Sequence, residues 1–198
     1  DSAVTHEYAY KLTDGSGVSE ILAVSDHQFL VDERDGTGLA DTPLLSDTAS
    51  EAKVKKLYLI DLSGAQDVSN ISGDLSAYAL SKSPFLDIVS KLSTAGINKY
   101  FIPSKLEGLA FGQDVLINGV TKHTLYIAND NDFLATVADP LKSPGDPTRA
   151  MVPNPNQIYV FAFGDEDLPG FVPQKIRAAH GLQCADRDGR NNSDHDQH

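Results

Sequence analysis

The sequence is poor in the residues that build cross-links and membrane segments. Among 198 residues there is a single cysteine, Cys184, which excludes an internal disulfide and a zinc site built from cysteines. No run of about 18 consecutive apolar residues occurs, so the sequence predicts no membrane-spanning helix. The remaining composition, with 40% hydrophobic and 22% charged residues, is that of a globular protein able to bury one core.

Basic residues are also scarce. Sixteen Lys and Arg stand against 28 Asp and Glu, which gives a formal net charge of −12. A surface this negative repels phosphate backbones, so we expect no binding to DNA or RNA. It is compatible with divalent cations, although net charge alone does not define a metal site.

Familiar catalytic motifs are missing too. The sequence has neither a Gly-x-Ser-x-Gly nucleophile elbow nor a Gly-x-x-x-x-Gly-Lys phosphate loop. The histidines at positions 6, 27, 123 and 180 are scattered and lack the spacing of a zinc-binding helix.

What the sequence does contain is a series of short apolar runs bounded by Gly, Asp, Asn and Pro, which predicts an all-β protein. Residues 85–92 fit either an outer strand or a short helix. The expected strands are 20–24, 28–32, 56–60, 106–111, 124–128 and 157–163, with an edge strand at 7–12.

Three of these segments resemble three others. The matching pairs are 19–23 with 106–110, 29–35 with 125–132, and 56–60 with 157–161. Each unit has a strand that opens with Glu, a strand that ends in acidic residues, and a strand centred on Tyr. A repeated antiparallel unit of this kind is typical of a β-propeller blade, and a β-sandwich is the alternative that shares the alternation.

The predicted fold is therefore part of a β-propeller with two four-stranded antiparallel blades. We place the blades at residues 16–92 and 104–173 of a partial propeller spanning 1–178, and assign the strand at 7–12 to a preceding blade. Because propellers close with about four blades or more, we expect a longer precursor or a second chain to supply the remainder. Residues 179–198 are polar and are expected to form a solvated tail.

Both predicted blades bring polar residues to one end of their sheets. In an antiparallel pair the start of one strand lies beside the end of the next. One end of the two units therefore gathers Glu20, Glu33, Arg34, Glu107, Asp130 and Asp132. Converging carboxylates suit Ca²⁺ or Mg²⁺, or they polarise a water molecule for attack on an ester.

Asp and Asn at strand ends also cap turns, and this is the interpretation that we favour for Asp35 and Asn131. Glu is a poor turn former, so a functional role is a stronger hypothesis for Glu20 and Glu107. Arg34 is either an ion-pair partner of Glu20 or a fork of donors that holds an anionic substrate.

Three motifs, taken in order, resemble the C-terminal half of the phytase-like esterase family. They are Glu33-Arg34-Asp35, Glu107-Gly108-Leu109-Ala110 and Asn129-Asp130-Asn131-Asp132-Phe133. The resemblance covers residues 16–165 and implies a secreted or periplasmic bacterial propeller of longer chain, with esterase or phosphoesterase activity. By the motif match it also implies site roles for Glu20, Glu33, Arg34, Glu107, Asp130 and Asp132.

The expected function is that of a metal-dependent hydrolase that acts on a small-molecule ester or phosphate ester at the mouth of the propeller channel. Glu20, Glu107 and Arg34 are the expected catalytic residues. The expected ligands of Ca²⁺, or of Mg²⁺ as the alternative, are Glu20, Glu33, Glu107, Asp130 and Asp132. The alternative function is a non-catalytic, Ca²⁺-binding propeller that binds a ligand or another protein.

Overall fold

The computed structural model describes residues 4–173, where the chain is all-β with antiparallel sheets; the predicted tail at 179–198 lies outside these residues. The strands are β1 (Gly17–Ala23), β2 (Gln28–Arg34), β3 (Lys55–Asp61), β4 (Lys82–Asp87), β5 (Leu106–Phe111), β6 (Val115–Ile117), β7 (Val120–Asn129), β8 (Thr136–Ala138), β9 (Met151–Pro153) and β10 (Ile158–Phe163). The described helices are α1 (Ile88–Thr94) and two 3₁₀ turns, Ser76–Tyr78 and Lys99–Phe101. None of these helices has the length and apolar character needed to cross a membrane.

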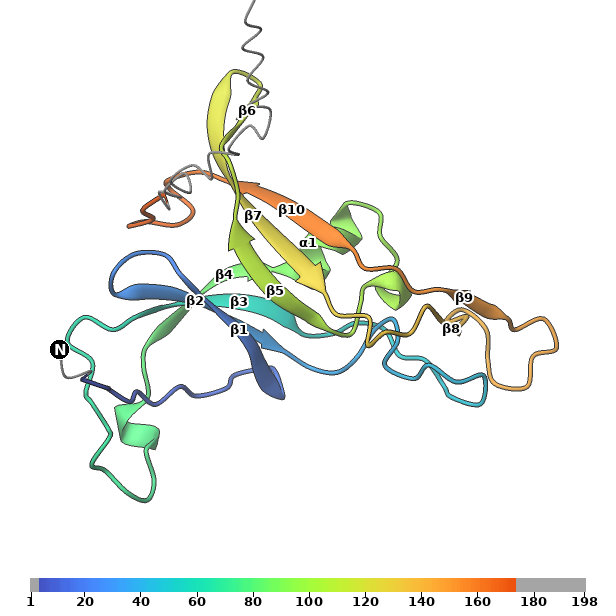
Figure 1. Cartoon of the computed structure of the whole chain (residues 1–198), viewed down its shortest axis with the longest axis horizontal. Helices are drawn as coiled ribbons and strands as arrows, with labels where there is room; N and C mark the ends of the chain where they lie inside the picture. The colour runs from blue at the N-terminus through green and yellow to red at the C-terminus, as the bar shows by residue number, and fades with distance from the viewer. Residues whose placement is uncertain (1–3, 174–198) are drawn as a thin grey trace, which may run out of the picture.

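Two four-stranded antiparallel sheets make up most of the fold (Figure 1). Sheet 1 is a meander in the order β1-β2-β3-β4, as predicted for a blade. In sheet 2 the long strands follow the order β10-β7-β5, and the fourth strand, β6, pairs with the first part of β7. The β6–β7 hairpin and the β8–β9 pair project from the body (Figure 1). The described sheets do not close on themselves, which is consistent with part of a propeller or a sandwich.

The N-terminal segment differs from the expected edge strand. Within the described residues, 7–12 form no strand, and Ala9 makes an isolated parallel bridge with Ala79. The Tyr10 hydroxyl donates a hydrogen bond to Glu33 of β2, so side-chain contacts also tie the segment to sheet 1. Its assignment to a preceding blade stays a prediction.

Strand register tests the predicted repeat residue by residue. Val31 of β2 pairs with Tyr58 of β3, and Ile127 of β7 pairs with Tyr159 of β10. The predicted matches of the second and third strands of the two units are therefore confirmed.

The first strands of the two units match one residue out of step with the prediction. Ile21 of β1 pairs with Val31 of β2, and Leu109 of β5 pairs with Ile127 of β7, the counterpart of Val31. Ile21 therefore corresponds to Leu109. Glu107 is thus the counterpart of Ser19 and not of Glu20. The shared Glu-apolar pattern suggested a match that the strand pairing does not follow.

The two sheets pack with unlike faces together. In sheet 1, the side that carries Leu30 and Leu57, which we call face A, belongs to the main hydrophobic core. In sheet 2 that core contains the opposite side, face B, with Leu125 and Ile127. Face A of sheet 1 therefore packs on face B of sheet 2, which is the head-to-tail relation of successive blades.

Face A of sheet 2 lies outside this core. Its apolar side chains Tyr126, Ile158 and Val160 are 38%, 68% and 56% exposed. Sheet 2 is thus apolar on both sides, with one side covered by sheet 1 and the other open in the described part of the chain.

Candidate functional site

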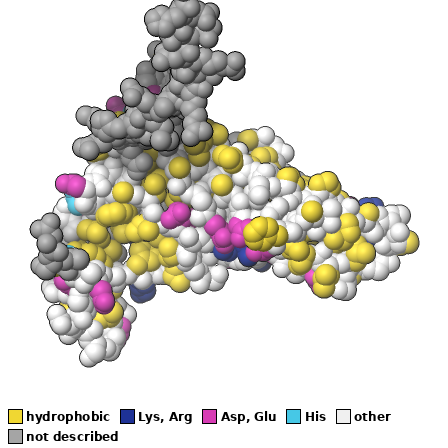
Figure 2. All heavy atoms as spheres, in the orientation of Figure 1, with side chains coloured by type: hydrophobic (Ala, Val, Ile, Leu, Met, Phe, Trp, Pro, Cys, Tyr) yellow, Lys and Arg dark blue, Asp and Glu magenta, His cyan; other side chains and the backbone are white. Residues whose placement is uncertain are grey.

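The predicted site residues lie at one end of the two sheets, where β1 and β5 begin and β2 and β7 end. Gly17 of β1 pairs with Arg34 of β2, Leu106 of β5 pairs with Asn129 of β7, and β1 and β5 contact each other. Figure 2 shows acidic and basic side chains gathered near the middle of the displayed face, in this part of the molecule.

A β-bulge lies in each of the two inner strands, at Ser19 in β1 and at Glu107 in β5. A bulge inserts one extra residue and changes the direction of its side chain. Arg34 bonds to both bulge residues, because its Nε donates to Ser19 Oγ at 2.5 Å and a terminal nitrogen donates to Glu107. Its ion-pair partner is therefore Glu107 of the other sheet, and not Glu20.

Glu20 lies directly opposite Asp32 in the β1–β2 ladder, so both side chains project from face A. Asp32 is 0% exposed, and neither of its carboxyl oxygens has a hydrogen-bond partner in the described residues. Glu20 is half-buried, and the one hydrogen bond found for it there comes from the backbone N–H of Ile21. Burial raises the pKa of Asp32 to about 7, against the lowering effect of Arg34.

Lys55 also lowers the pKa of Asp32 but makes its hydrogen bonds elsewhere. Its buried Nζ donates to Asp35 Oδ1 at 2.7 Å and to three backbone carbonyl oxygens. Burial lowers the pKa of Lys55, and the ion pair with Asp35 opposes that change. Within residues 4–173, Asp32 therefore has basic groups nearby but accepts no hydrogen bond from them.

Glu33 lies on face B, away from the other predicted ligands, because alternate residues of β2 project to opposite sides. It is 0% exposed and accepts hydrogen bonds from the Tyr10 hydroxyl, from the backbone N–H groups of residues 13–15, and from Lys82 Nζ at 2.7 Å. Burial raises its pKa, but the bonds from Lys82 and the amides outweigh this and hold the pKa below its usual value. In this structure Glu33 anchors the N-terminal segment to sheet 1.

The acidic residues after β7 belong to a turn. Asp130 accepts the N–H of Asp132 at 2.9 Å, and Asn131 accepts the N–H two residues further on. Asp35 makes the same type of bond after β2, so the turn interpretation of Asp35 and Asn131 is confirmed. Asp132 also forms an ion pair with Lys105 Nζ at 2.5 Å.

Oxygen donors suited to Ca²⁺ or Mg²⁺ are present, but a complete ligand set is not. Within residues 4–173, no three acidic, His or Cys side chains lie in an arrangement that could hold a metal ion. Glu107 and Asp132 are paired with basic side chains. The unpartnered oxygens of Asp32, opposite Glu20, are the feature that fits a cation.

Comparison with known families places this site in a wider context. The family model named phytase-like, described as the esterase-like activity of phytase, matches residues 1–133. The chain belongs to the phytase-like family. No curated protein and no solved structure matches it. The matched part of this phytase-like chain includes all of sheet 1 and β5 to β7, and so contains both Asp32 and the Arg34–Glu107 pair.

Asp32 is the candidate site residue of this phytase-like chain that the sequence reasoning missed. The available signal was the period of two in a strand, which puts Asp32 and Arg34 on one face and Glu33 on the other. The Glu33-Arg34-Asp35 motif directs attention to three consecutive residues, although consecutive strand residues cannot share a face.

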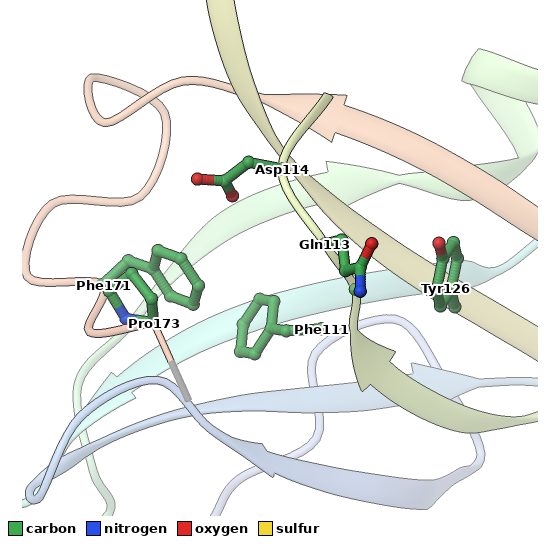
Figure 3. Close-up of a pocket in the computed structure, with 7 residues that line it drawn as sticks. Phe111, Gln113, Asp114, Tyr126, Phe171 and Pro173 are labelled. Atoms are coloured by element: carbon green, nitrogen blue, oxygen red, sulfur yellow. The ribbon is translucent and has the colours of Figure 1, made fainter. Parts of the chain in front are cut away.

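A cavity of about 610 Å³ lies at the opposite end of β5 and contains none of the predicted site residues (Figure 3). Near it, His123 forms hydrogen bonds with Asp114 at 2.7 Å and Asp165 at 2.8 Å, and these two bonds raise the pKa of His123. The cavity is lined by Phe111, Gly112, Gln113, Asp114, Tyr126, Phe171 and Pro173.

Proposed function

We propose that this chain hydrolyses an ester or phosphate ester at the Arg34–Glu107 site. The observation that carries the proposal is the position of Arg34, a partly exposed guanidinium among carboxylates where four strand ends meet. Its Nε–H donates to Ser19, and its terminal nitrogens each donate once, to Asp35 and to Glu107. Each terminal nitrogen has a second N–H, and these two donors can bind an anionic group of the substrate.

Glu107 is the carboxylate placed to accept a proton from an attacking water molecule. Its side chain is 30% exposed, and its contact with Arg34 fixes its position next to the proposed anion site. Glu20 supplies a second carboxylate on the neighbouring inner strand. A bound Ca²⁺ or Mg²⁺, held by Glu20 and Asp32, would act as a Lewis acid toward the substrate oxygen.

We also propose that the chain is part of a larger propeller that is secreted or periplasmic. The head-to-tail packing of the two sheets and the exposed apolar face A of sheet 2 support the larger propeller. A further sheet, from a longer precursor or a second chain, would cover Tyr126, Ile158 and Val160. Location outside the cytoplasm and a small-molecule substrate rest on the family resemblance.

A non-catalytic binding module is the second candidate, and one observation favours it. Several of the acidic residues at the strand ends are paired with basic side chains, as in Asp35–Lys55, Glu107–Arg34 and Asp132–Lys105. Such pairs can serve the architecture alone.

Hydrolysis of generic p-nitrophenyl esters and phosphates tests the choice, measured with Ca²⁺, with Mg²⁺ and with a chelator. We expect Glu107→Gln to lower turnover by about 100-fold or more, the effect typical of losing a general base. Asp26→Asn is a matched surface control, since the Asp26 side chain is 91% exposed. Turnover that Glu107→Gln leaves unchanged would remove the catalytic assignment, and a parent chain inactive on every substrate would favour the binding module.

A further inference from the structure

We infer that Glu20 and Asp32 together bind one divalent cation, Ca²⁺ or Mg²⁺, between the two sheets. The inference deepens the proposed function, because the ion would lie next to the Arg34–Glu107 pair. The cation site depends, however, on the charges and hydrogen bonds of β1 and β2 and not on any activity. No sequence motif assigns Asp32 to a metal, and it was absent from the predicted ligand set.

Asp32 is buried without a hydrogen-bond partner in the described part of the chain. The residue is 0% exposed, and both carboxyl oxygens lack hydrogen-bond partners within residues 4–173. Buried polar side chains in folded proteins are nearly always hydrogen-bonded, and an ionised carboxylate without a partner is strongly unfavourable. The two oxygens therefore require either a proton or a cation.

The hydrogen bonds of the basic side chains around Asp32 go to other partners within the described residues. On face A, Arg34 bonds to Ser19 and Glu107, and Lys55 bonds to Asp35 and backbone carbonyl oxygens. On the other side of sheet 1, Lys82 pairs with Glu33 and Lys56 pairs with Asp14. The described chain thus supplies no ammonium or guanidinium group that donates a hydrogen bond to Asp32.

Glu20 brings a second carboxyl group next to Asp32. Residues directly opposite each other in an antiparallel ladder have Cβ atoms about 4.5–5.5 Å apart, so the two carboxyl groups are neighbours on face A. Like charges this close disfavour each other, and a divalent cation between them removes the conflict. Glu20 is half-buried and Asp32 is buried, so the pair extends from the surface inward and gives an ion access to the site.

Ligand chemistry fits the same conclusion. Carboxylate oxygens are the usual ligands of Ca²⁺ and Mg²⁺, and Mg²⁺ in particular is commonly held by one or two carboxylates while keeping several waters or binding substrate phosphates. Two protein carboxylates therefore fit a site whose remaining ligands are water molecules or substrate oxygens.

Sheet 2 shows that the fold itself does not require these acids. The positions equivalent to Glu20 and Asp32 are Gly108 and Ala128, and the same strand register forms around them. The acidic pair occurs in sheet 1 and not at the equivalent positions of sheet 2, which indicates a local role for it.

The test is cation binding by the whole chain, stripped with chelator and dialysed at neutral pH. Calorimetric titration with CaCl₂ or MgCl₂ should show one saturable site. At about 100 times the Kd, the Tm should rise by about 5 °C or more. Asp32→Asn should weaken binding by about tenfold or more and abolish the rise in Tm. The matched surface change Asp26→Asn should preserve both.

The inference is wrong if the parent chain shows no saturable binding and no rise in Tm, in which case a proton satisfies Asp32. It is also wrong if Asp32→Asn binds like the parent. Should Asp32→Asn fail to unfold cooperatively, Glu20→Gln decides by the same two measurements. Cation binding without hydrolysis overturns the proposed function alone, whereas hydrolysis in chelator with no cation binding overturns the cation site alone.

Discussion

The two sheets have the same strand register but different chemistry at equivalent positions. Glu20 and Asp32 of sheet 1 correspond to Gly108 and Ala128 of sheet 2. On the opposite face, Glu33 corresponds to Asn129. The same strand register therefore forms with or without charged side chains at these positions. The ionisable groups of sheet 1 are not required for the strand pairing.

Face B shows the same contrast in its packing. In sheet 2 it is aromatic, and the Phe163 ring centroid lies 5.9 Å from that of Phe111 and 5.4 Å from that of Phe171. In sheet 1 it contains the buried Glu33–Lys82 ion pair. Removing one charge of this buried pair should therefore destabilise sheet 1.

The largest effect is expected for Glu33→Gln. The change breaks a buried ion pair and leaves Lys82 without its carboxylate, which costs about 3–5 kcal/mol of unfolding free energy. Because the folded pKa of Glu33 is lowered, this stabilisation is present above the unfolded pKa and is lost as pH falls through the folded pKa. The difference between parent and variant in urea unfolding should therefore shrink toward acid pH.

Asp14→Asn is the control for Glu33→Gln, since it removes a more exposed ion pair with Lys56 and should lower the unfolding free energy much less than Glu33→Gln does. A cost for Glu33→Gln no greater than that of the control would contradict the anchoring role.

A smaller effect of opposite sign is expected for Asp32→Asn in chelator. The pKa of Asp32 rises from 3.8 to about 7 on folding, so the folded state binds more protons between these values. Stability of the parent should then fall as pH rises through this range. The variant lacks this loss and should be more stable by about 1–3 kcal/mol at pH above 7, and equal to the parent at acid pH. An equal difference in urea unfolding at both extremes of pH would contradict the burial argument.

The smallest effect is expected for Ala128→Asp, which gives sheet 2 the carboxylate that sheet 1 has. Within residues 4–173, face A of sheet 2 is not covered, so in this chain the loss of unfolding free energy should be about 1 kcal/mol or less. Ala128→Asn serves as the neutral control in the same denaturant series. A loss above about 3 kcal/mol would show that this face is buried in solution.

Much of the fold could be predicted because its signals are local. Alternation located the main strands, and the matches of the second and third strands follow from it. Asn118-Gly119 is a further local signal that the sequence analysis did not use. Its φ values of 51° and 79° belong to the type I′ turn that closes the β6–β7 hairpin.

The site could be predicted only in part, because it depends on relations between strands. Alternation would have separated Asp32 from Glu33, since it requires only the period of two. The Arg34–Glu107 pair joins residues 73 apart in sequence through a bulge and a sheet–sheet contact. No local pattern specifies that geometry, which is why the sequence suggested Glu20, and not Glu107, as the ion-pair partner in one of the two interpretations of Arg34.

The packing of face A on face B gives the arrangement a direction. Two sheets joined through like faces would form a finished pair, whereas each unlike-face contact leaves one unmatched surface of each kind at the two ends of the series. The contact between unlike faces therefore does not determine the number of sheets that join. That number depends on the rotation between neighbours, because the rotation alone decides whether the last sheet meets the first. Residues between the sheets, Leu30 and Ile127 among them, thus influence the size of any ring as well as its stability.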